Sequence, residues 1–116
     1  MTVDAIERVV SAFNARDAEA FAAAFAVDGV LVDYPDTRAG EGRIGIFAYM
    51  SKFFEAYPNA SVELVGRIDL GTRQITHERF DPGNGSPHYD AGLVYQLRDN
   101  EIIQMDFVRE RRESDG

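Results

Sequence analysis

The second half of the chain reads as consecutive β-strands, and this feature limits the possible folds more than any other. Apolar and polar residues alternate over several residues at a time, which is the period of a strand with one buried face. The segments with this pattern are residues 61–70, 73–81, 88–98 and 101–109. Turn residues separate them at Gly71-Thr72, 82–87 and Asp99-Asn100. Neighbouring strands joined by short turns pair as hairpins, so the pattern predicts a mostly antiparallel sheet.

The first half of the chain predicts three helices and one short strand. Residues 4–15 place Ile6, Val9, Val10 and Phe13 on one stripe, the spacing of an amphipathic helix. Asp17 is a suitable N-cap for a second, Ala-rich helix at 18–26. The other expected elements are a turn at Asp28-Gly29, a strand at 30–34 closed by Pro35, and a helix at 42–56 that Pro58 prevents from continuing.

This order of elements predicts an α+β fold in a single domain over residues 1–116, with a charged tail at 110–116. Three helices from the N-terminal half would cover one side of a curved, mostly antiparallel sheet. Such an arrangement encloses an apolar pocket, a place where small-molecule sites are common. The residues expected in the pocket wall are Met50, Phe53, Tyr57, Tyr89, Leu93, Met105 and Phe107.

Charge and composition exclude several classes of partner. The formal net charge is -8, so neither free nucleic acid nor an anionic membrane surface is an expected partner. The chain has no cysteine and only two histidines, without metal-ligand spacing, so we expect no disulfide, no metal and no cofactor. The N-terminal residues lack the pattern of a signal peptide, and a cytoplasmic location is therefore expected.

Four polar residues are the candidates for chemistry. Alternation puts His77, Arg79 and Asp81 on one face of their strand, and Asp33 lies near the end of the first strand. If this face lines the pocket, these side chains could orient water, polarise an oxygen atom and transfer a proton. The structural alternatives are a self-neutralising Arg79–Asp81 pair, a hydrogen-bonded wall histidine at 77 and a turn-capping Asp33.

The motifs resemble those of the nuclear transport factor 2-like superfamily, which includes ketosteroid isomerases, limonene epoxide hydrolases and SnoaL-like cyclases. The similar segments are residues 10–17 with the Ala/Phe-rich stretch after them, Asp28-Gly29, residues 40–43, and the final hairpin at 93–103. The resemblance covers nearly the whole chain. It implies the cone-shaped fold and a small lipophilic ligand, and it leaves isomerase, cyclase and hydrolase chemistry open.

Two reaction types can be compared position by position. Ketosteroid isomerases use an aspartate base and two side chains that donate hydrogen bonds to the oxyanion. The base corresponds to Asp33 in this sequence, and the two donors correspond to Val9 and Leu93. Residues 77–81 resemble the epoxide hydrolase motif through Arg79 and Asp81. The partner aspartate of that enzyme corresponds to Phe107, and its water-holding Tyr and Asn fall near Leu31 and Asp33.

The sequence therefore supports two functions. One is an enzyme that performs acid–base chemistry on a small lipophilic molecule, with Asp33 as base or water-orienting group, Arg79 and Asp81 as a polarising pair, and His77 as a supporting donor. The other is a non-catalytic ligand-binding or dimerisation module with a degenerate site. The resemblance also implies a homodimer through the outer sheet face, and Val62, Leu64, Val94, Val108 and their neighbours are the expected apolar patch.

Overall fold

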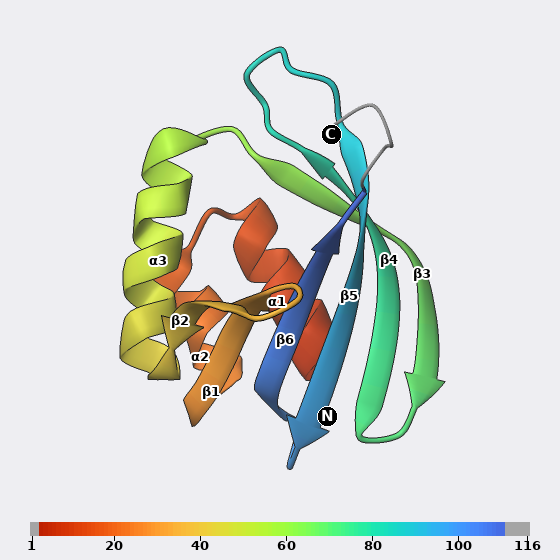
Figure 1. The fold of residues 1–116 in the computed structure, drawn as a ribbon. Coiled ribbons are helices and arrows are strands. Elements are labelled where there is room, and N and C mark those ends of the chain that lie inside the picture. Colours follow the sequence, from red (N-terminus) through yellow and green to blue (C-terminus); the bar gives the residue numbers. More distant parts are fainter. Residues whose placement is uncertain (1–2, 111–116) are drawn as a thin grey trace.

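The computed structural model describes residues 3–110, and in this part three helices cover one face of a six-stranded sheet (Figure 1). The helices are α1 (Ala5–Asn14), α2 (Ala18–Ala23) and α3 (Gly42–Ala56). The strands are β1 (Phe25–Asp33), β2 (Thr37–Glu41), β3 (Ser61–Leu70), β4 (Arg73–Asp81), β5 (Tyr89–Arg98) and β6 (Glu101–Arg109). The predicted α+β class is confirmed. The charged tail predicted from residue 110 onward lies almost entirely outside the described residues.

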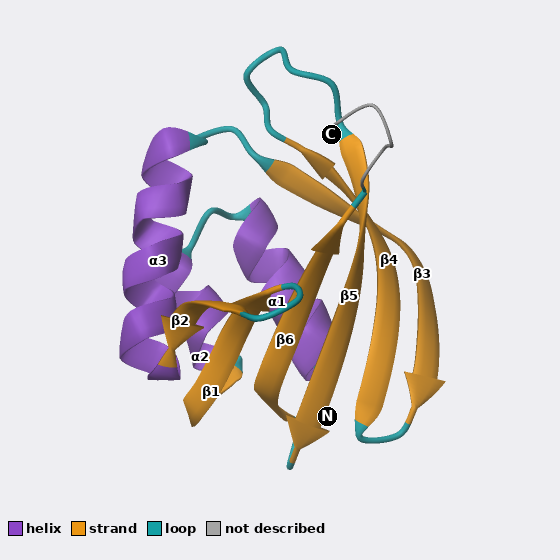
Figure 2. Cartoon of the chain, in the orientation of Figure 1, coloured by secondary structure: helices purple, strands orange, loops and turns teal. Residues whose placement is uncertain are grey.

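The sheet is curved and open, with the strand order β2-β1-β6-β5-β4-β3 (Figure 2). Successive strands from β3 to β6 pair antiparallel, as the hairpin pattern predicted. β1 pairs antiparallel with β2 on one side and parallel with β6 on the other. The chain therefore brings the end of its first strand beside the end of its last described strand.

The region around the first strand differs from the prediction. The helix expected at 18–26 ends at Ala23, and β1 already begins at Phe25. The turn expected at Asp28-Gly29 lies inside β1, where the pairing with β6 shifts register between Phe25 and Val30. A Cβ atom on Gly29 would lie 2.8 Å from the carbonyl oxygen of Ile102, so glycine permits this close approach of the backbones. β2, which was not predicted, completes a hairpin with β1.

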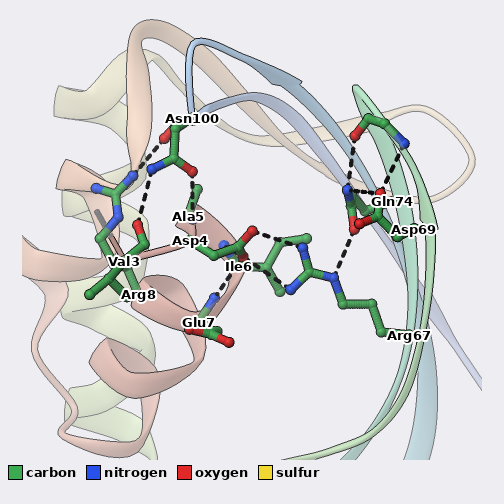
Figure 3. Close-up of polar contacts among 11 residues, drawn as sticks. Val3, Asp4, Ala5, Ile6, Glu7, Arg8, Arg67, Asp69, Gln74 and Asn100 are labelled. Atoms are coloured by element: carbon green, nitrogen blue, oxygen red, sulfur yellow. Dashed lines mark hydrogen bonds and ion pairs between the residues drawn. The ribbon is translucent and has the colours of Figure 1, made fainter. Parts of the chain in front are cut away.

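A polar cluster ties the start of α1 to the sheet (Figure 3). Asp4 caps the helix by accepting hydrogen bonds from the backbone amides of residues 6 and 7. The same carboxylate pairs with Arg67 of β3 at 2.8 Å, which lowers the pKa of Asp4 chiefly through that hydrogen bond. Arg67 in turn donates to the buried amide oxygen of Gln74, whose NH₂ group donates to Asp69 at 2.6 Å. We call Asp4, Arg67, Asp69 and Gln74 the anchor cluster.

The turn between β5 and β6 adds a second attachment for α1. Asp99 and Asn100 both have positive φ, as a two-residue type I′ hairpin turn requires, so the predicted Asp99-Asn100 turn is confirmed. The side chain of Asn100 accepts from the backbone amide of Ala5 and donates to the carbonyl of Val3 (Figure 3). These contacts hold one end of α1 against the sheet and fix the position of the helix over the inner face.

The hydrophobic core fills the space between the helices and the concave face of the sheet. Phe13 of α1 packs against this core, with its ring centroid 5.3–5.8 Å from those of Phe53, Phe54 and Phe80. Ile6 and Val9, expected on the same helix stripe, are fully or almost fully buried. In the described part of the chain, no helix has the length and apolar character needed to cross a membrane.

Candidate functional site

A cavity of about 160 Å³ lies between the helices and the inner sheet face. Of the seven wall residues predicted from the sequence, six line it: Met50, Phe53, Tyr89, Leu93, Met105 and Phe107. The seventh, Tyr57, lies outside the lining, and its ring packs 5.0 Å from that of Phe53. Other lining residues include Val9, Val10, Phe13, Leu31, Asp33, Tyr49, Val62, Glu78, Phe80, Ala91, Tyr95 and Arg109. The lining is therefore mostly apolar and rich in aromatic rings.

The strand β4 presents the opposite face to the cavity from the one expected. Its buried residues are Gln74, Thr76, Glu78 and Phe80, whereas Ile75, His77 and Asp81 are exposed and Arg79 is half-exposed. The predicted alternation is present, and the assignment of its inward side was wrong. Period-two alternation states which residues share a face, and the packing against α1 and α3 decides which face is buried.

His77 and Arg79 therefore belong to a group on the outer sheet face. Both contact Asp90 of the neighbouring strand, His77 at 3.4 Å and Arg79 at 3.1 Å. Arg79 also lies 3.9 Å from Glu63 of β3. Asp81 is outward as well and accepts a hydrogen bond from the backbone amide of Gly83 in the following loop. The structure brings none of these three predicted residues into the cavity.

Asp33, the remaining predicted residue, lies on the rim of the cavity. Its carboxylate is 3.3 Å from the guanidinium of Arg109, and both side chains are partly exposed. The parallel pairing of β1 with β6 creates this contact, because it sets Asp33 opposite Phe107 and thus near the end of β6. Tyr49 and Tyr89 also line the cavity, and burial raises the pKa of both phenols. The rim is polar, with a carboxylate and a guanidinium in contact.

The inner end of the site is formed by Glu78, a residue that the sequence analysis left on the wrong side of its strand. Its side chain is 96% buried, at 4% exposure, and lines the cavity. One carboxyl oxygen, Oε2, accepts hydrogen bonds from Thr76 Oγ1 at 2.5 Å and from the Tyr95 hydroxyl at 2.9 Å. Desolvation by the apolar surroundings raises the pKa of Glu78 against the opposing effect of these two donors. The hydroxyl of Tyr95 is itself inaccessible, and burial raises its pKa well above the ordinary value.

The second carboxyl oxygen of Glu78 is available for a ligand. No residue between 3 and 110 makes a hydrogen bond to Oε1, while Oε2 already accepts from two hydroxyl groups. A proton on the carboxyl group would therefore reside on Oε1 and leave both existing hydrogen bonds intact. The carboxyl group can take up or release a proton at this atom without disturbing its supports.

The other charges of the lining balance each other. Asp33 and Arg109 form an ion pair on the rim, so Glu78 is the one titratable carboxyl of the described lining without a cationic partner. Among residues 3–110 there is no group of three or more side chains placed to hold a metal ion. The described lining offers carboxyl, hydroxyl and guanidinium groups, which can transfer protons and form hydrogen bonds.

The comparisons with known proteins agree with this architecture. Residues 6–105 match the model of the SnoaL-like domain. The chain belongs to this SnoaL-like family. No curated protein matches the sequence.

Solved structures share the fold of this SnoaL-like domain at low sequence identity. An uncharacterised cystatin-fold protein of Novosphingobium aromaticivorans is 22% identical, with a TM-score of 0.82 over 90% of this chain and 95% of that one. A protein of Catenulispora acidiphila with a ketosteroid isomerase-like fold, in complex with trimethylamine, is 18% identical, with a TM-score of 0.80 over 92% and 85%. A candidate polyketide cyclase of Sinorhizobium meliloti is 16% identical, with a TM-score of 0.78 over 91% and 94%. These likenesses establish the fold.

Proposed function

We propose that this SnoaL-like protein is an enzyme that performs acid–base chemistry on a small lipophilic molecule, with Glu78 as the group that exchanges the proton. The observation that carries the proposal is the free Oε1 atom of a carboxyl group buried in an apolar, aromatic-lined cavity. A carboxyl group whose pKa is raised toward neutrality serves well as either general acid or general base. Thr76 and Tyr95 hold its orientation.

Asp33 keeps a place in this proposal as a polar group of the rim. Its ion pair with Arg109 faces the open end of the cavity, so it would meet the part of a substrate that is not buried. His77, Arg79 and Asp81 have no role in it, because they face away from the cavity. The proposed proton-exchanging residue therefore lies on the inner face of β4, whereas the sequence predicted residues of its outer face.

The reaction type stays open among isomerase, cyclase and hydrolase. The positions that supply oxyanion donors in ketosteroid isomerases are Val9 and Leu93, and both add apolar surface to the lining. Phe107, which corresponds to the epoxide hydrolase aspartate, does the same. The proposed enzyme would therefore use Glu78 from β4 in place of the groups that its relatives carry elsewhere.

A proton-exchange assay, which does not require the natural substrate to be known, tests the proposal. The purified protein is incubated in deuterium oxide with a panel of small lipophilic ketones, and deuterium incorporation at carbon is measured by mass spectrometry. We expect the wild-type protein to catalyse exchange and Glu78→Gln to lose about 10²–10⁴-fold, the usual contribution of a general acid or base. Glu63→Gln, on the outer face, is the matched control. Equal exchange by Glu78→Gln and wild type would overturn the assignment of Glu78.

The alternative is a binding module without catalysis, which the apolar residues Val9, Leu93 and Phe107 at the positions of catalytic groups favour. It predicts that ligands bind and that none is turned over. In that case ketones from the panel would bind in ligand-observed NMR, and neither protein would accelerate deuterium exchange.

We also propose a homodimer through the outer sheet face. Val62 and Leu64 do not belong to that face, because Val62 pairs with inward-facing Phe80 and Leu64 pairs with inward-facing Glu78. The exposed apolar residues there include Ile68 and Ile75, which are directly paired across β3 and β4, and Leu70. Sedimentation velocity at micromolar concentration should show a dimer that Ile68→Glu converts to monomer, and a wild-type monomer would contradict the proposal.

A further inference from the structure

A trough runs across the inner face of the sheet from Glu78 to Arg109. The strand pairing sets Glu78 of β4 opposite Ala91 of β5, and Ala91 opposite Arg109 of β6. All three residues line the cavity. Ala91 is 4% exposed and carries the smallest side chain of this row. The floor between the two polar groups is therefore a single methyl group.

Larger side chains form the two walls of the trough. Tyr89 and Leu93 flank Ala91 on the same face of β5, two residues away in each direction. Phe80, which pairs with Tyr89, extends the first wall over β4, and Phe107, which pairs with Leu93, extends the second over β6. A flat ring placed on Ala91 would contact apolar surface on both sides while its ends meet polar groups.

The two ends of the trough offer different hydrogen-bonding groups. At the inner end, Oε1 of Glu78 is free to donate or accept, depending on protonation. At the outer end, Arg109 donates from Nη2 to Asp33, and within residues 3–110 its other side-chain N–H groups and Asp33 Oδ1 make no hydrogen bond. Because this pair is neutral as a whole, it suits an uncharged group such as a hydroxyl or carbonyl. For an anion the attraction to Arg109 is offset by repulsion from Asp33, and for a cation the attraction to Asp33 is offset by repulsion from Arg109.

The dimensions limit the ligand to a small molecule. A cavity of roughly 150 Å³ accommodates one benzene molecule, and this cavity measures about 160 Å³. Two strand spacings separate the α-carbons of Glu78 and Arg109, which amounts to about 10 Å. A single ring with one polar substituent at each end matches both the volume and the span.

We propose, building on the function proposed above, that the cavity binds an uncharged single-ring molecule with a polar group at each end, lying across Ala91 between Glu78 and the Asp33–Arg109 pair. Ala91 is then the residue that determines specificity, because its small side chain leaves the trough continuous. A larger residue there would divide the cavity and separate the two polar ends.

The test compares five compounds of one ring by calorimetric or NMR titration near neutral pH. 4-Hydroxyacetophenone carries an uncharged polar group at each end of its ring, whereas acetophenone and phenol carry one such group each. 4-Hydroxybenzoate has a negatively charged end, and tyramine has a positively charged end. We expect 4-hydroxyacetophenone to bind at least about tenfold more tightly than each of the other four, the effect of one buried group left unpaired.

Two kinds of variant locate the effect. Ala91→Leu should abolish the advantage of the two-ended compound, with Ala56→Leu on the exposed end of α3 as its control. Because a larger residue in a packed cavity can itself destabilise the fold, Arg109→Met provides an independent arm on the exposed rim. It should remove the same advantage by lowering the affinity for 4-hydroxyacetophenone more than the affinity for acetophenone.

The outcomes separate this inference from the proposed function. Equal binding of one-ended and two-ended compounds, or tightest binding of a charged compound, would overturn the inference and leave the role of Glu78 standing. Retention of the full advantage in Arg109→Met would overturn it as well. The proposed function itself depends on the deuterium-exchange comparison of Glu78→Gln with wild type, which uses none of these variants.

Discussion

Two buried polar side chains on one face of β4 differ in how completely their polar atoms are hydrogen-bonded. Gln74 and Glu78 are equally buried, at 4% exposure, and lie four residues apart on the same strand face. In the anchor cluster, the amide of Gln74 is fully occupied, since it accepts from Arg67 and donates to both Asp69 and Gly71. In the cavity, Glu78 has one oxygen that accepts two hydrogen bonds and one oxygen that accepts none from residues 3–110.

The difference teaches how to separate a structural polar group from a functional one. A buried group whose hydrogen bonds are all satisfied contributes to a unique fold, and its removal leaves its partners unpaired. A buried polar group that lacks a hydrogen-bond partner lowers the free energy of unfolding unless another interaction compensates. Gln74 therefore stabilises the fold, and Glu78 is the residue that we propose contacts a ligand.

The largest effect is expected when the anchor cluster is broken. Gln74→Leu removes three hydrogen bonds and leaves Arg67 Nε without its partner, so the free energy of unfolding should fall by about 2 kcal/mol. Urea denaturation monitored by circular dichroism measures the change. A loss no larger than that of Glu78→Gln would remove the distinction drawn between the two clusters.

A smaller effect of opposite sign is expected at Glu78. Desolvation raises the pKa of Glu78 in the folded state above its value in the unfolded chain, about 4.3. The free energy of unfolding therefore falls as the pH rises from the unfolded pKa to the folded pKa, because the buried carboxyl group must ionise. Glu78→Gln keeps a partner for Thr76 and Tyr95, so it should be more stable than wild type at alkaline pH and should lose this advantage as the pH falls toward the unfolded value. Denaturation curves for both proteins across the pH range test this. A gain that is constant with pH would contradict the assignment of the shift to Glu78.

The smallest effect is expected for Asp4→Asn, with the reverse pH dependence. The Arg67 contact lowers the folded pKa of Asp4, so its stabilisation is present above the unfolded value of about 3.9 and is lost as the pH falls through the folded value. Asparagine keeps the helix cap, and the cost at neutral pH should be about 0.5–1 kcal/mol, that of a partly exposed ion pair. The same denaturation series measures it, and a cost that grows with acidity would count against it.

Much of the fold could be predicted because its signals are local. The N-cap role of Asp17, the buried stripe of α1 and the Asp99-Asn100 turn depend on residues close together in the chain, and all are confirmed. The start of β1 at Phe25 could not be read in the same way. It depends on the parallel pairing with β6, a partner from the other end of the sequence.

The candidate site was harder to predict because the two faces of β4 compete. The outer row carries His77, Arg79 and Asp81, and these residue types predicted a catalytic group on that face, so Glu78 on the opposite face was not a candidate. One signal favours the observed orientation: a row with that many charges is rarely buried, whereas the other row ends in Phe80. Arg109, the last residue of the strand expected at 101–109, gave no such signal.

The parallel pairing of β1 with β6 also sets the order in which the molecule can fold. Hairpins such as β3–β4 join neighbouring segments and can form early, whereas Asp33 and Arg109 are 76 positions apart. During synthesis on the ribosome, the β1–β2 hairpin can join the sheet only after β6 emerges. The contact between Asp33 and Arg109 therefore forms late, and the rim of the cavity is incomplete until then.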